Sequence, residues 1–128
     1  MDYRNKSIPW LLKTLVRHFN KFIRERDQDE RCISCGQFSR LEAGHYYPST
    51  VSGLRFTENN VNGQCKRCNR HLHGNLIEYR RGLVEKIGLE EVEWLELQYS
   101  YYKKHGFKWN RFELIEKIEK YKNVNRIN

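Results

Sequence analysis

Two CxxC pairs constrain the fold of this chain more than any other feature of its sequence. The pairs are Cys32-Ile-Ser-Cys35 and Cys65-Lys-Arg-Cys68, and the 29 residues 36–64 separate them. Structural zinc takes four tetrahedral ligands, with thiolate sulfurs at about 2.3 Å, and each CxxC turn can point both sulfurs at one ion. The spacing therefore predicts a structural zinc site, whose closed shell leaves no position for a substrate.

The compartment expected for the chain favours metal binding over disulfide formation. The first seven residues are polar and lead into an amphipathic segment, unlike the apolar core of a secretory signal peptide. No run of about 18 apolar residues is present, so no membrane partner is expected. We therefore expect a cytoplasmic protein, in which disulfides are rare and paired cysteines more often bind a metal.

The length and the charge of the chain indicate its domain organisation and the kind of partner it binds. A chain of 128 residues suits one compact domain, with an N-terminal amphipathic basic helix (1–30), a zinc-bound core (31–86) and a C-terminal helical extension (87–128). A core of this size is modest, so a metal staple would help the chain to fold. The formal net charge of +8 attracts polyanions, which makes nucleic acid the first candidate partner and an unpartnered basic surface the alternative.

The pattern of apolar residues predicts an α+β fold, with a small sheet among several helices. Residues 9–26 carry an apolar stripe at helical spacing, and Ser7 is the expected N-cap. Short strands are expected around 43–47 and 53–56.

Three more helices are expected after these strands. One covers 68–86 and the next covers 89–104, with Gly106 as its C-terminal stop. The last helix follows Asn110, which has the spacing of a capping box with Glu113.

Histidines and asparagines gather around the two cysteine pairs. His45 lies between the pairs, Asn60 precedes the second pair, and Asn69 follows its last cysteine directly. Hydrolysis of a phosphodiester requires a base that activates water, and neutral imidazole suits this role near pH 7. A divalent ion would stabilise the developing charge. Asn69 and His73 are spaced i, i+4 and would share a helix face, which makes them candidate ligands of that ion, with His71 as an alternative.

Basic residues near these groups are candidate contacts to DNA phosphates, and a solvated basic face is the alternative interpretation. They are Arg55, Lys66, Arg67 and Arg70. Asn60 also has a structural alternative, because its side chain could tie down the loop before the second cysteine pair.

Four segments, taken in order, resemble one protein family. They are CxxCG at Cys32–Gly36, GHYYP at Gly44–Pro48, LRFxExN at Leu54–Asn60, and QCxxCNxHxxGNLxxYR within Gln64–Arg81. Over about residues 31–100 the chain is very similar to the bacteriophage lambda NinG (Rap) recombination protein family. More loosely, it resembles the HNH (ββα-metal) superfamily that includes phage endonuclease VII.

The resemblance implies a zinc-stapled ββα-metal (HNH-like) nuclease core with flanking helices, made by a phage or prophage in a bacterial cell. It implies a structure-selective endonuclease that cleaves branched DNA, such as Holliday junctions and D-loops, in phage homologous recombination. Mg²⁺ or Mn²⁺ would be the catalytic ion, and no small-molecule cofactor is implied.

The same resemblance suggests roles for individual residues. By position, His45 takes the place of the general base, Asn69 that of a metal ligand on the helix, and Asn60 that of the central asparagine. Gly44 stands where the superfamily often has a metal-binding aspartate. The ion would then need another ligand, for which His73 and His71 are the candidates.

Two other functions fit parts of the sequence. A non-catalytic zinc module that binds nucleic acid would explain the charge and the four cysteines, but not His45 and Asn69. An HNH nuclease with a restriction or packaging role would explain all of them. A nuclease that cuts two strands of a junction together would favour a homodimer, with the helices of 89–121 as the contact surface.

Overall fold

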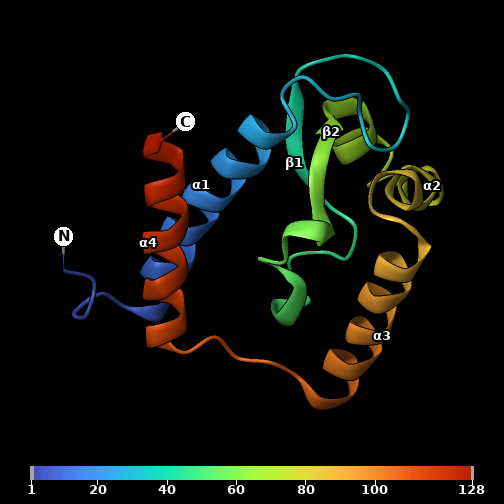
Figure 1. The fold of residues 1–128 in the computed structure, drawn as a ribbon. Coiled ribbons are helices and arrows are strands. Elements are labelled where there is room, and N and C mark those ends of the chain that lie inside the picture. Colours follow the sequence, from blue (N-terminus) through green and yellow to red (C-terminus); the bar gives the residue numbers. More distant parts are fainter. Residues whose placement is uncertain (1, 128) are drawn as a thin grey trace.

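The structure is a computed structural model that describes residues 2–127, so residues 1 and 128 at the ends of the predicted segments lie outside the described part. Helices dominate, and the sheet found among the described residues has two strands, which confirms the predicted α+β class. The elements follow in the order α1 (Ile8–Arg26), β1 (Leu41–His45), η1 (Ser52–Leu54), η2 (Glu58–Asn60), β2 (Val61–Cys65), η3 (Arg67–His71), α2 (Leu76–Ile87), α3 (Leu89–His105) and α4 (Arg111–Ile127). In Figure 1 the sheet lies between the α1–α4 pair and the α2–α3 pair. No helix within residues 2–127 is long and apolar enough to cross a membrane.

Helix α1 begins and packs as its sequence predicts. The Ser7 hydroxyl caps the helix by accepting a hydrogen bond from the Trp10 amide at 3.2 Å, which satisfies one of the free amides of the first turn. The apolar stripe of α1 packs with residues of α4 in one core cluster, and its fully buried members are Leu11, Leu15, Phe19 and Ile23. Phe19 meets the ring of Tyr121 edge to face, with centroids 5.0 Å apart. Each such buried side chain contributes about 2 kcal/mol of transfer free energy.

Helix α4 reaches this position through a chain segment that crosses the molecule after α3 (Figure 1). The Asn110 side chain accepts from the Glu113 amide at 2.8 Å, and Glu113 accepts from the Asn110 amide at 3.3 Å. This reciprocal pair is the predicted capping box. The positive φ of Gly106, 74°, ends α3 at the expected residue. Local capping signals therefore fix where three of the helices begin or end.

The second strand lies elsewhere than predicted. Its expected segment, 53–56, forms a 3₁₀ turn and a loop instead, and Leu54 and Phe56 are buried in two different core clusters. Alternate burial of these two residues imitates the period of a strand. The true partner of β1 is Val61–Cys65, antiparallel, with Leu41 opposite Cys65 and His45 opposite Val61.

The helix predicted over 68–86 is broken near its start. Arg67–His71 forms one π-helical turn, and α2 begins only at Leu76. Between them His73, Gly74 and Asn75 all have positive φ. The Gly74 amide donates to the Cys68 carbonyl at 2.8 Å, so the chain wraps around the last cysteine before it turns into α2.

A buried carboxylate joins the end of α1 to the sheet and to α2. Asp27 is 2% exposed and accepts hydrogen bonds from Arg26 at 2.8 Å, from the Gly63 amide at 2.8 Å and from Lys86 at 3.0 Å. Burial alone would raise the pKa of Asp27, but the Arg26 and Gly63 donors and the Lys86 charge outweigh it and lower the pKa. The carboxylate is therefore charged and fully partnered in the fold.

Replacing Asp27 with asparagine should lower the free energy of unfolding by about 2–3 kcal/mol, because two half-buried cations would lose their counter-charge. The native contribution of Asp27 is present above its unfolded pKa near 3.8 and is lost as pH falls through the lower folded value. Urea denaturation at pH 7 measures the loss, with Asp29→Asn as the exposed control. Equal stability of the two variants would contradict the role given to this network.

Candidate functional site

The four cysteines meet in space. Their sulfur atoms all lie within 4.8 Å of one another, as the spacing predicts, and could hold a metal ion such as zinc. Three of the side chains are buried and Cys35 is half-buried. Within residues 2–127 no other group of three His, Cys, Asp or Glu side chains is close enough to hold a metal. The first pair precedes β1 and the second begins at the end of β2, so the cluster closes one end of the hairpin.

The electrostatics of the thiols favour a bound cation. Burial opposes ionisation of Cys32, but backbone N–H donors, that of Cys65 among them, outweigh it and lower its pKa to about 7. Burial raises the pKa of Cys35, and it raises the pKa of Cys68 to about 12. Four thiolates this close together are stable only when a cation neutralises them. The donor set, four soft sulfurs in a closed cluster, fits Zn²⁺.

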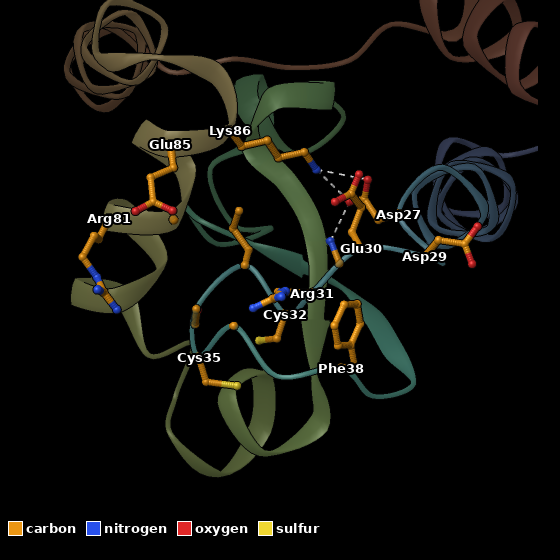
Figure 2. Close-up of a pocket in the computed structure, with 15 residues that line it drawn as sticks. Asp27, Asp29, Glu30, Arg31, Cys32, Cys35, Phe38, Arg81, Glu85 and Lys86 are labelled. Carbon is orange, nitrogen blue, oxygen red and sulfur yellow. Dashed lines mark hydrogen bonds and ion pairs between the residues drawn. The ribbon is translucent and has the colours of Figure 1, made fainter.

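A hollow of about 410 Å³ lies beside the first cysteine pair, opposite α2. Figure 2 shows Cys32 and Cys35 on one side of it and Arg81 and Glu85 on the other. Both signs of charge line this hollow, and Lys86 is already bound to Asp27. Because its charges are mixed, this hollow has no preference for an anion.

His45 ends strand β1 and is half-buried. Its Nε2 lies 3.0 Å from the carbonyl oxygen of Arg55. Since a carbonyl only accepts, Nε2 donates, and the neutral ring then has Nδ1 free to accept a proton. Burial lowers the pKa of His45, opposed by the Arg55 carbonyl, so the ring is neutral at pH 7. These are the properties required of a general base.

Asn60 is completely buried, and its amide is fully used. Its Nδ2 donates to the carbonyls of Tyr47 and Leu54 at 3.0 and 3.1 Å, and its Oδ1 accepts from the Tyr47 amide at 2.9 Å. The side chain thus holds the loop that follows His45. This is the structural alternative that the sequence left open, and the buried amide presents no atom to a substrate.

Asn69 contacts a carboxylate that the sequence analysis did not identify. Its Nδ2 donates to Glu42 Oε1 at 2.9 Å, and Arg70 binds the same carboxylate at 3.0 and 2.6 Å. Burial would raise the pKa of Glu42, but the Asn69 and Arg70 donors outweigh it and lower the pKa. The signal available in the sequence was an acid three residues before His45 on the same strand.

The structure explains why Gly44 cannot carry an acid. A Cβ on Gly44 would lie 2.1 Å from Oε1 of Gln64, which is fully buried and fills that space. Gln64 is fixed by hydrogen bonds from its Nε2 to Ser34 at 2.9 Å and to the Gly74 carbonyl at 2.6 Å. Glu42 lies two residues earlier on the same face of β1 and is the carboxylate nearest to this position along the strand.

The two candidate histidine ligands are not brought to Asn69 as predicted. Asn69 belongs to the π-helical turn, whereas His73 lies beyond it with φ of 51°, so the two side chains do not share a helix face. The i, i+4 expectation is therefore wrong, because the helical turn ends at His71, before His73. His71 and His73 are both exposed. Glu42 replaces them as the side chain in contact with Asn69.

A second hollow, of about 750 Å³, relates Asn69 to strand β1. Asn69, Glu42 and Ala43 all line it. His45 follows Ala43 by two residues and projects from the same face of the strand, although it does not itself line the hollow. His45 and Asn69 form no direct hydrogen bond within the described residues. Glu42, which contacts Asn69, and His45 are three residues apart on β1. Their side chains therefore project from opposite faces of the strand.

The four predicted phosphate contacts separate into two groups. Lys66 and Arg70 line the second hollow, whereas Arg67 is exposed outside it. Arg55 also lies outside it, in the connection between the two strands, with its guanidinium 5.3 Å from the centre of the Phe56 ring. Of the four basic residues predicted from their closeness to the cysteines in the sequence, only Lys66 and Arg70 therefore belong to the second hollow.

Comparison with known proteins places the chain in a family. Residues 4–127 match the family model described as bacteriophage lambda NinG protein. The chain is 42% identical over 103 residues to protein ninG of Salmonella phage P22, which covers 78% of this chain and 49% of the relative. It is 41% identical over 98 residues to protein ninG of Escherichia phage lambda, which covers 74% and 48%. The chain thus spans about half the length of these curated relatives. No solved structure matches it. The protein therefore belongs to the bacteriophage lambda NinG family.

Proposed function

We propose that this protein is a metal-dependent endonuclease of the HNH type that cleaves branched DNA, such as Holliday junctions and D-loops, during phage recombination. The observation that carries the proposal is the state of His45. Its imidazole is neutral, half-buried and fixed through Nε2, so Nδ1 is available to take a proton from water. It ends a hairpin strand that also carries Glu42 and borders a basic hollow.

The residues around His45 have defined tasks in this proposal. The Arg55 carbonyl selects the tautomer of the ring, and Asn60 holds the loop that begins directly after His45. The imidazole then removes a proton from the water that attacks the phosphorus. Lys66 and Arg70 hold the phosphate backbone by charge-assisted hydrogen bonds.

The HNH superfamily implies a catalytic Mg²⁺ or Mn²⁺ ion, and the oxygen donors beside β1 fit such an ion. The Glu42 carboxylate is ionised and 2.9 Å from the Asn69 amide, so one carboxylate and one carboxamide are available together. When bound, the ion would stabilise the negative charge that develops on the phosphate. Glu42 and Asn69 would hold it from the face of β1 opposite to His45, and in this proposal they take the place of His71 and His73.

The test is cleavage of a labelled four-way junction, a D-loop, linear duplex and single-stranded DNA in Mg²⁺, in Mn²⁺ and in EDTA. We expect metal-dependent cutting of the branched substrates and little cutting of linear duplex. Equal cutting of linear duplex would instead favour a restriction or packaging role. Binding without cutting in either metal would contradict the nuclease and favour the non-catalytic binding module.

A further inference from the structure

The second hollow is built from three segments that are distant in sequence. Helix α1 contributes Asn20 and Arg24, and the segment that leads into β1 contributes residues 40–43. The third segment, at the second cysteine pair, contributes Lys66, Asn69 and Arg70. Among its nine lining residues only Leu41 and Ala43 are apolar. Pockets for small molecules are lined mainly by hydrophobic and aromatic side chains. The composition of this hollow therefore argues against a small organic ligand.

The charge of the hollow is strongly one-sided. Four basic side chains face one acid, which leaves a formal charge of +3, in contrast to the mixed charges beside the first cysteine pair. Arg70 is paired with Glu42. Arg24, Arg40 and Lys66 take part in none of the ion pairs found within residues 2–127. Three cations without a counter-charge around one hollow repel one another, and an anion bound between them would remove this repulsion.

The position of these cations points to a continuous strand of nucleic acid. They come from α1, from the entry to β1 and from the second cysteine pair, so they are spread around the hollow instead of converging from one loop. Guanidinium groups bind phosphates in a bidentate manner, and the amides of Asn20 and Asn69 can donate to the same backbone. Ala43 borders the hollow two residues before His45 on the same strand face.

We infer that this hollow binds the sugar–phosphate backbone of a DNA strand, with Arg24 of α1 and Arg40 before β1 as phosphate contacts in addition to Lys66 and Arg70. The inference rests on the proposal that DNA is the substrate. It makes α1 part of the binding surface as well as part of the core, and it directs the bound strand along β1 toward His45.

The experiment compares Arg24→Ala/Arg40→Ala with Lys13→Ala/Lys104→Ala. All four side chains are exposed, and both double variants remove two positive charges, but only the first pair lines the hollow. Binding to a fluorescent four-way junction is measured by anisotropy in EDTA at several salt concentrations. We expect Arg24→Ala/Arg40→Ala to bind about tenfold more weakly or worse and to reduce the slope of log K against log salt by about 2. The control variant should keep the wild-type slope.

The outcomes separate the inference from the proposed function. If Arg24→Ala/Arg40→Ala binds the junction with the affinity and slope of the control, the hollow is not the binding site, whatever the cleavage assay shows. If it loses binding while the wild-type protein cuts nothing in Mg²⁺ or Mn²⁺, the hollow stands and the nuclease proposal fails. A wild-type protein that binds no DNA overturns both. Circular dichroism of each variant establishes that the fold is intact.

Discussion

Replacing His45 with alanine is expected to lower the rate of junction cleavage by about 10²–10⁴-fold while junction binding stays intact. In the proposed mechanism the imidazole provides the proton acceptor at Nδ1, whereas its Nε2 contributes only a hydrogen bond to the Arg55 carbonyl. Single-turnover cleavage and anisotropy in EDTA measure the two effects separately. His18→Ala is the matched control, because His18 is also half-buried but lies on α1 and has no part in the proposed cleavage mechanism. Wild-type cleavage by His45→Ala would remove the general base from the mechanism.

The pH dependence of cleavage tests the same residue independently. Burial lowers the pKa of His45 below its ordinary value of 6.5, so the neutral form of the ring predominates at pH 7. The rate should fall as pH decreases through this lowered pKa, because protonation removes the acceptor, and it should be level above 6.5. The stability of the fold should depend on pH in the same direction. Because the unfolded chain binds the proton on His45 more readily, the contribution of neutral His45 to the free energy of unfolding is present above pH 6.5 and is lost on acidification.

Replacing Cys65 with serine is expected to remove bound zinc and unfold the protein. Structural zinc sites contribute roughly 10–16 kcal/mol of apparent binding free energy, which is comparable to the whole stability of a small domain, about 5–15 kcal/mol. Cys65 is the last residue of β2, pairs with Leu41 and also donates its amide to the Cys32 sulfur. Its loss therefore affects the metal cluster and the hairpin together.

Elemental analysis and a thermal melt followed by circular dichroism measure these effects. Ser39→Ala provides the control, since Ser39 is an exposed residue between the two cysteine pairs. Protein purified without chelator should contain one zinc per chain, and prolonged chelation should reproduce the unfolding of Cys65→Ser. A wild-type protein that melts cooperatively at the same temperature with and without metal would contradict a structural role for zinc.

The sequence was sufficient for features that depend on neighbouring residues. The Ser7 cap, the Asn110–Glu113 box and the Gly106 stop are all present, because capping is decided within one helical turn. The cysteine cluster was equally predictable, since CxxC geometry restricts where the sulfurs can point. These signals required no knowledge of tertiary contacts.

The second strand and the broken helix depend on tertiary contacts and were not predictable. Strand β2 contains Asn62 and Gln64, which are polar residues that an isolated strand would expose. They are buried because Asn62 bonds to Tyr79 at 3.1 Å and Gln64 bonds to Ser34 and the Gly74 carbonyl. Each of these partners lies at least ten residues away in the sequence, so no local pattern predicts that Asn62 and Gln64 are buried.

Glu42 shows the same limitation at the candidate site. A single acidic residue is usually solvated, and its place three residues before His45 is too weak a signal to mark it as functional. Its place in the proposed site comes from contacts with Asn69 and Arg70, which approach only when the second cysteine pair folds against β1. The sequence predicts a histidine partner instead, because an unbroken helix would place His73 beside Asn69.

The pairing of α1 with α4 determines when the protein can finish folding. Since synthesis proceeds from the N-terminus, the apolar face of α1 leaves the ribosome well before Leu114, Ile118 and Tyr121, which cover it and lie far later in the chain. Closing such a long stretch of chain is entropically costly and slows folding. The cysteine cluster and hairpin can assemble before that closure, so the nascent chain would carry an organised centre beside an uncovered amphipathic helix, a state that chaperones recognise.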